Sequence, residues 1–104
     1  MKKILILGAG RSASSLIEYL LKLAETHSYE VTVADTSLEL ARQKTKNQPG
    51  ARTIALDTSD EAKTHEEIQR ADLVVSMLPA FLHPAIAKQC VKLKKHLVTA
   101  SYVS

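Results

Sequence analysis

A glycine-containing segment near the N-terminus has residue types and a spacing that can hold phosphate groups. It reads GAGRSA from residue 8 to residue 13, a G-x-G-x-x-A pattern. Gly8 can adopt the backbone angles of a tight turn, Gly10 leaves the main chain open to a pyrophosphate, and small Ala13 allows close helix packing. The N–H groups at the start of a following helix attract phosphates, and Arg11 and Ser12 can add polar contacts.

An acidic residue follows at the distance that dinucleotide recognition requires. Asp35 lies 22 residues after Ala13, at the end of a predicted strand. A carboxylate there can accept hydrogen bonds from the adenosine ribose hydroxyls, and it repels a 2′-phosphate. We therefore expect a NAD or NADP site that includes Asp35 and Thr36, with NAD favoured by Asp35. Two alternatives stay open: Asp35 caps the next helix, or Arg42 and Lys44 accommodate a 2′-phosphate.

Two further strand ends are expected to border the same crevice. Asp57 and Thr58 follow a predicted third strand, where such residues border the adenine. Leu78 and Pro79 follow a fourth strand beside the glycine loop. The alternatives are that Thr58 caps a helix together with Glu61, and that Pro79 simply ends its strand.

The elements that must position these residues alternate between two hydrophobic periods. Short apolar runs predict five strands, at residues 3–7, 30–34, 51–56, 72–78 and 96–100. Helical spacing predicts a helix after each of the first four, and Thr36 with Glu39 and Thr58 with Glu61 match capping boxes. This alternation predicts an α/β fold, a Rossmann-type doubly wound parallel sheet with order 3-2-1-4-5 and helices on both faces. Ligands bind such sheets at the carboxyl ends of the central strands.

Composition narrows the function classes. The net charge of +3 is too small to indicate nucleic-acid binding, and aromatic residues make up only 4% of the chain. No apolar run approaches the roughly 18 residues of a membrane span. The single cysteine, Cys90, cannot form an internal disulfide and is expected to pack in a helix core. We expect a cytoplasmic protein without a metal site, since no histidine pair has helical spacing and His83 alone is expected near the crevice.

Two segments of the sequence resemble the N-terminal domain of the saccharopine dehydrogenase family. They read LPAFLHP at residues 78–84 and HLVTASYVS at residues 96–104. The resemblance, which is strongest to the L-glutamate-forming type, implies a pyridine-nucleotide oxidoreductase. Such an enzyme oxidises the secondary amine of saccharopine to an imine, which water splits to glutamate and aminoadipate semialdehyde.

The family resemblance also implies roles for individual residues. The family's glycine loop maps onto Gly8, Gly10 and Ala13. Its cofactor-lining segments map onto Asp35, Asp57, Leu78 and Pro79. Its substrate-side Ser-Tyr pair maps onto Ser101 and Tyr102. Members that use NADP tend to carry a small residue and an arginine where this chain has Asp35 and Thr36, which again favours NAD.

Family members continue for several hundred residues, which shapes the expected organisation. We expect residues 1–104 to be the NAD(P)-binding Rossmann domain at the N-terminus of a longer enzyme. It should bind the dinucleotide without turnover, because the catalytic residues and most contacts to the small amino-acid substrate lie beyond residue 104. Two other hypotheses are a free-standing nucleotide-sensing regulatory module and a domain kept for association. In the latter, the last strand and residues 101–104 bind a partner or a second copy; no nucleic acid or membrane partner is expected.

Overall fold

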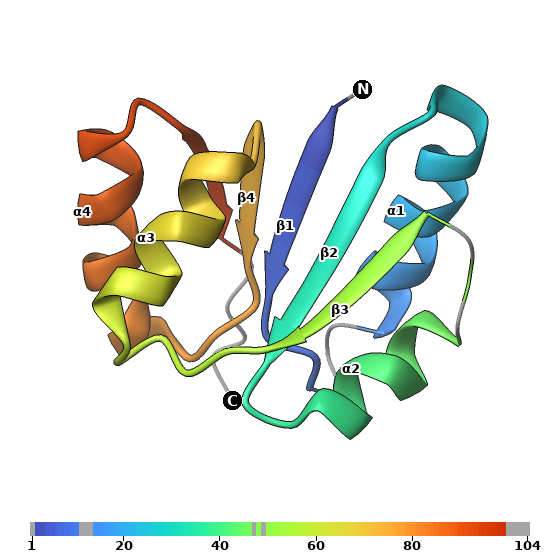
Figure 1. Cartoon of the computed structure of the whole chain (residues 1–104), viewed down its shortest axis with the longest axis horizontal. Coiled ribbons are helices and arrows are strands. Elements are labelled where there is room, and N and C mark those ends of the chain that lie inside the picture. The colour runs from blue at the N-terminus through green and yellow to red at the C-terminus, as the bar shows by residue number, and fades with distance from the viewer. Residues whose placement is uncertain (1, 11–13, 47, 49, 100–104) are drawn as a thin grey trace.

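A five-stranded parallel sheet forms the centre of the molecule (Figure 1). This computed structural model describes residues 2–10, 14–46, 48 and 50–99. The strands are β1 (Lys3–Leu7), β2 (Glu30–Asp35), β3 (Ala51–Ala55), β4 (Leu73–Ser76) and β5 (His96–Thr99). Their order is β3-β2-β1-β4-β5, which confirms the predicted topology. Leu7 lies opposite both Ala34 and Ser76, so the carboxyl ends of the three central strands are level.

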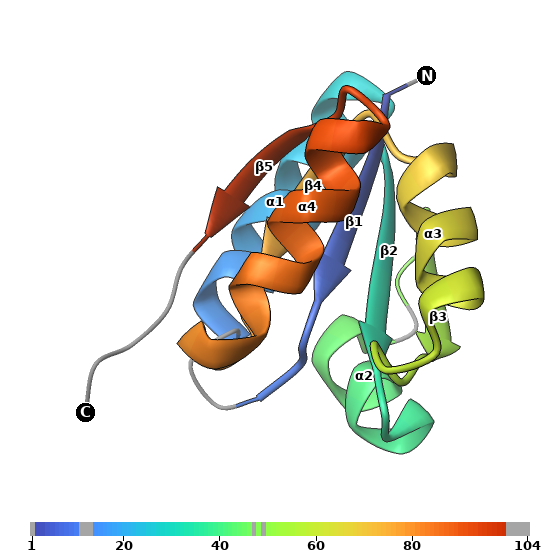
Figure 2. The same cartoon turned by 90° about the vertical axis from the view of Figure 1, so that its left-hand side faces the viewer.

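Helices cover both faces of the sheet. They are α1 (Ser14–His27), α2 (Leu38–Thr45), α3 (Glu61–Arg70), the 3-10 turn η2 (Ala80–Leu82) and α4 (His83–Lys92). Figures 1 and 2 show α1 and α2 on one face and α3 and α4 on the other, the doubly wound arrangement predicted from the sequence. Among the described residues, no helix has the length and apolar content needed to cross a membrane.

Each face of the sheet has its own apolar core, because neighbouring residues of a strand point to opposite sides. In β1, Ile4 and Ile6 pack toward α1, while Leu5 and Leu7 pack toward α3 and α4. The run of apolar residues in β1 therefore reflects burial on both faces, as is usual for a parallel sheet.

The predicted capping boxes at Thr36 and Thr58 are wrong. The side chain of Ser37 caps α2 by accepting a hydrogen bond from the Leu40 N–H, and Asp60 caps α3 by accepting one from the Lys63 N–H. The caps lie one and two residues later than predicted, because the aspartate at or just after each strand end first folds the chain into a turn.

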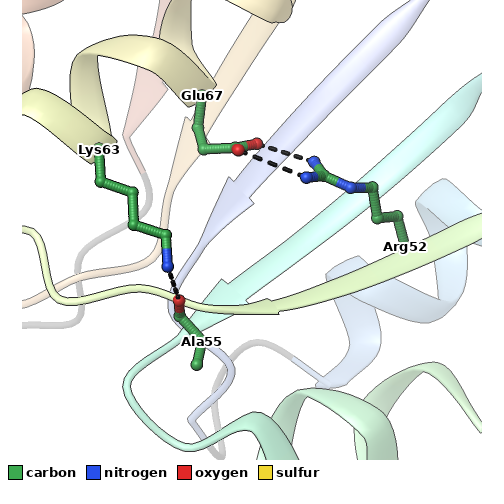
Figure 3. A network of polar contacts seen from close by, with 4 residues as sticks. All are labelled: Arg52, Ala55, Lys63 and Glu67. Carbon is green, nitrogen blue, oxygen red and sulfur yellow. Dashed lines mark hydrogen bonds and ion pairs between the residues drawn. The ribbon is translucent and has the colours of Figure 1, made fainter.

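Polar contacts fix α3 against β3 (Figure 3). Arg52 on β3 donates two hydrogen bonds to the carboxylate of Glu67 on α3, at 2.8 and 3.4 Å. The Glu67 side chain is only 8% exposed, and its carboxylate raises the pKa of the Arg52 guanidinium. Lys63 donates from Nζ to the carbonyl oxygen of Ala55 at 3.1 Å. Because α3 buries few apolar side chains, we expect these polar contacts to contribute to its packing against β3.

Candidate functional site

A sharp turn carries the chain away from the end of β1. Gly8 has a φ of +98° and donates its N–H to the carbonyl oxygen of Ala34 at 2.7 Å. A Cβ placed on Gly8 would lie 3.3 Å from the carbonyl carbon and oxygen of Met77. Both the backbone angle and the tight contact with the segment after β4 therefore require glycine here.

Open space lies next to Gly10, which is exposed. A Cβ on Gly10 would meet no atom of the described residues within 4 Å, so none of them blocks an approach to the main chain there. The other predicted loop residues, Arg11, Ser12 and Ala13, lie outside the described residues.

The carboxylate of Asp35 faces the glycine loop. Its Oδ2 accepts a hydrogen bond from the Ala9 N–H at 2.8 Å. Its Oδ1 accepts one from the Ser37 N–H at 2.9 Å and a longer one from the Thr36 hydroxyl at 3.4 Å. The alternative that Asp35 caps the next helix is wrong, because Ser37 supplies that cap. A carboxylate offers about four lone-pair positions, so acceptor capacity is left for a ligand hydroxyl.

Asp57 forms a turn of the same kind at the end of the neighbouring strand. Its Oδ1 accepts hydrogen bonds from both the hydroxyl and the N–H of Ser59, at 2.7 and 2.9 Å. These two bonds, that from the hydroxyl being the stronger influence, lower the pKa of the Asp57 carboxyl. Asp57 is exposed, and Thr58 beside it does not cap α3, since Asp60 does.

A cleft of about 920 Å³ opens at this edge of the sheet. Of the residues predicted to bind a cofactor, the cleft is lined by Gly8, Asp35, Thr36, Asp57, Thr58 and Leu78. Gly10 and Pro79 are not among its lining residues. The sequence prediction thus found the residues that follow β1, β2, β3 and β4.

One wall of the cleft was not predicted. It is formed by α3 and α4, with one face of α4 contributing Ala85, Lys88, Gln89 and Lys92. This i, i+3, i+4, i+7 spacing is visible in the sequence, but its polar residues look like a solvent-facing surface. His65 on α3 also lines the cleft whereas His83 does not, so the expectation that His83 alone lies nearby is wrong.

The basic residues of α2 do not reach the cleft. Lys44 donates from Nζ to the hydroxyl of Ser14 at the start of α1, and Arg42 is exposed. Neither residue lines the cleft. A role of this pair in holding a 2′-phosphate therefore has no support from their positions.

The remaining candidates from the sequence are the cysteine, potential metal ligands and the substrate-side pair. Cys90 is 1% exposed in the core between α4 and the sheet, as predicted, and burial raises the pKa of its thiol. Within the described ranges, no group of three or more potential metal ligands comes together. The predicted substrate-side residues, Ser101 and Tyr102, lie outside the described residues.

The residues around the cleft suit a nucleotide. The volume of the cleft lies within the range of roughly 300–1,000 Å³ that is usual for small-molecule sites. Two carboxylates, Asp35 and Asp57, offer acceptors for ribose hydroxyls and an amino group, while Leu56, Leu78 and Leu82 give an apolar surface for a flat base. The exposed main chain at Gly10 leaves room for a pyrophosphate at the loop.

Comparisons with known proteins agree with this geometry. The family model described as the saccharopine dehydrogenase NADP binding domain matches residues 4–104. The L-glutamate-forming saccharopine dehydrogenase [NADP(+)] of Schizosaccharomyces pombe is 36% identical over 104 residues, which are 100% of this chain and 22% of that protein. The mitochondrial alpha-aminoadipic semialdehyde synthase of Mus musculus is 33% identical over 99% of this chain and 11% of its own length.

A solved structure gives the same result. Apo L-glutamate-forming saccharopine dehydrogenase from Saccharomyces cerevisiae superimposes with a TM-score of 0.84 and 32% sequence identity, over 100% of this chain and 22% of that one. The chain thus spans about a fifth or less of the relatives that it matches. A nicotinamide dinucleotide is the cofactor class that this match indicates. By sequence and by fold, the chain belongs to the saccharopine dehydrogenase NADP binding domain family.

Proposed function

We propose that this chain is the cofactor-binding domain of an oxidoreductase that oxidises saccharopine to glutamate and aminoadipate semialdehyde, and that it prefers NAD to NADP. The observation that carries the preference is the position of the Asp35 carboxylate at the end of β2, 2.8 Å from the glycine loop. The reaction belongs to a whole protein in which a further domain holds most of the substrate, since this chain matches only 22% of the S. pombe relative.

The chain's own residues bind and orient the cofactor. Asp35 would accept hydrogen bonds from the adenosine ribose, the main chain at Gly10 would leave room for the pyrophosphate, and Leu56 and Leu78 would offer an apolar surface to the adenine. The chemistry supplied by the cofactor when bound is acceptance of a hydride from the carbon next to the secondary amine. Holding the cofactor at one edge of the sheet would reduce the entropy cost of bringing it together with the substrate.

The preference for NAD follows from charge. A 2′-phosphate placed beside the ionised Asp35 brings two anions together in a partly enclosed cleft, which disfavours NADP. Lys44 already donates to Ser14 and lies outside the cleft, so it does not offset this repulsion. The name of the S. pombe relative includes NADP(+), so the preference proposed for this chain differs from the cofactor named for that relative.

Calorimetric titration with NAD and with NADP tests the preference. We expect NAD to bind about tenfold more tightly, the equivalent of about 1.4 kcal/mol. Asp35→Ala should narrow that ratio, whereas Asp72→Ala should leave it unchanged. Asp72 is the matched control because it also accepts a backbone hydrogen bond, from Lys3 at 2.8 Å, but at the opposite edge of the sheet. Equal affinities in the parent chain, or no binding of either dinucleotide, would contradict the proposal.

A turnover assay addresses the rest of the proposed function. The 104-residue chain should bind NAD yet form no reduced cofactor when saccharopine is added, because one wall of the reaction site is absent. An open reading frame that continues past residue 104 into a second domain agrees with the enzyme. A stop codon at that point favours the regulatory nucleotide-sensing module instead.

A further inference from the structure

We propose that Asp35 is also a positioning residue, whose carboxylate fixes the glycine loop so that the loop can receive the pyrophosphate. The inference deepens the proposed function and rests on it for the affinities, while the loop contact itself can be tested without a cofactor. The juxtaposition behind it is the Asp35 Oδ2 and the Ala9 N–H, 26 residues apart in sequence.

The contact joins a buried part of the loop to the neighbouring strand. Ala9 is 0% exposed, although Gly10 next to it is open to solvent. A buried N–H that loses its acceptor costs more free energy than an exposed one, because water cannot replace the lost partner. The acceptor here is a charged oxygen, which makes the stronger kind of hydrogen bond. Asp35 therefore does more for the loop than a neutral side chain could.

A second bond holds the residue before it. Gly8 donates to the carbonyl oxygen of Ala34, the residue that precedes Asp35, at 2.7 Å. Two successive N–H groups of the loop thus bond to two successive residues of β2. Only the first of these bonds is made to the backbone, so only the second depends on which side chain ends the strand.

The carboxylate is needed because its two oxygens serve two different backbone donors. Oδ2 accepts from Ala9 and Oδ1 accepts from Ser37. An asparagine has one oxygen and one NH₂ group, so one of these two N–H groups would face a donor. Asp57 differs, since a single oxygen accepts both bonds from Ser59. Asparagine can reproduce that arrangement, which makes Asp57→Asn a matched control.

A positioning role and a purely selective role predict opposite results for NADP. If Asp35 only repelled a 2′-phosphate, its removal would strengthen NADP binding. If Asp35 also holds the loop, removal weakens the site for the pyrophosphate, which both dinucleotides share. The affinity for NADP then falls together with the affinity for NAD, although NAD loses more because it also loses its ribose contact.

Amide spectra of the ¹⁵N-labelled, cofactor-free chain test the contact first. Asp35→Asn should shift the Ala9 amide resonance and speed its hydrogen exchange about tenfold, whereas Asp57→Asn should leave Ala9 unchanged. A scalar coupling across the hydrogen bond, between the Ala9 nitrogen and the Asp35 carboxyl carbon, tests the contact in the unmodified chain and needs no variant. An unchanged Ala9 amide in Asp35→Asn, or the absence of that coupling, overturns the inference.

Titration of Asp35→Asn then tests the effect on the cofactor. We expect this change to lower the affinity for NADP about tenfold and that for NAD further. Asp72→Ala, the control outside the cleft, should leave both affinities unchanged. Tighter NADP binding by Asp35→Asn overturns the positioning role. A chain that shows the Ala9 effects but binds neither dinucleotide refutes the proposed function while the contact between Asp35 and the loop stands.

Discussion

The sequence Asp-Thr-Ser occurs twice, at residues 35–37 and 57–59, and each copy lies at or just after the carboxyl end of a strand, at the same edge of the sheet. In both copies the aspartate Oδ1 accepts a hydrogen bond from the serine N–H at 2.9 Å. Within the described part of the glycine loop, residues 8–10, a hydrogen bond is made to Asp35 and none to Asp57. The difference lies in strand order, because β2 pairs with β1 whereas β3 is one strand further away, about 5 Å. The local sequence thus determines the hydrogen bonds within each turn, and the strand order determines which other segment the turn can contact.

The two turns also differ in what supports them. The first is tied through its aspartate to the loop after β1. The second is followed by α3, which Lys63 and the pair of Arg52 with Glu67 hold against β3 (Figure 3). Each turn is closed by its own carboxylate, but the first is tied to the rest of the sheet by that carboxylate and the second by the helix that follows it.

The largest effect on stability should come from disturbing the glycine loop, to which the first turn is tied. Gly8→Ala forces a side chain into a φ of +98° and against the Met77 carbonyl, which should cost about 2–4 kcal/mol of unfolding free energy. Gly10→Ala is the matched control because its Cβ meets no atom of the described residues within 4 Å, so its cost should stay below about 1 kcal/mol. Urea unfolding monitored by circular dichroism measures both. Equal costs for the two glycines would show that the loop is not held at Gly8.

A smaller effect should follow when the support of the second turn is removed. Glu67→Gln leaves Arg52 without its anionic partner in a half-buried setting, and we expect a loss of about 1–3 kcal/mol. Glu18→Gln removes an exposed ion pair with Lys46 and should cost less than about 0.5 kcal/mol. Urea midpoints of the two variants give the comparison. If Glu67→Gln costs no more than Glu18→Gln, the pair of Arg52 with Glu67 does not hold α3.

The smallest effect concerns the charge of the second aspartate. The hydrogen bonds from Ser59 lower the pKa of the folded Asp57 carboxyl. Their stabilising contribution is therefore full above the unfolded pKa of about 3.9, and it is lost as the pH falls through the folded pKa. Asp57→Asn lacks this contribution at every pH, so the parent and the variant should differ slightly at pH 7. That difference should vanish in acid, as urea midpoints measured across the pH range will show; a gap that widens in acid contradicts the sign.

Much of the fold could be predicted because it depends on patterns within each element. Strand β1 matches its apolar run residue for residue, and the strict alternation of strands and helices predicted the sheet order. The capping residues were placed one and two residues too early, since Thr36 and Thr58 are good caps in isolation but lie inside aspartate turns. The short turn η2 was missed, because three residues are too few to show a period.

The predicted part of the site consists of residues at the carboxyl ends of strands. Asp35 and Asp57 were found because the carboxyl ends of parallel strands meet at one edge. Lys88 and Gln89 were not, because polar residues along one face of a helix look the same whether they face water or a cleft. The bond from Ala9 to Asp35 depends on how β1 and β2 align, with Leu7 opposite Ala34, and no local pattern carries that alignment.

The contact between Gly8 and the Met77 backbone also determines when the site can form during folding. During synthesis, the first half of the chain emerges with Gly8 and Asp35 but without β4, so the turn lacks the wall on which it rests. The partners of β1 come from residues 30–35 and 73–76, and such non-local pairings form slowly. We therefore expect a nascent chain that stops before β4 to acquire no nucleotide affinity, which makes nucleotide binding a late reporter of folding.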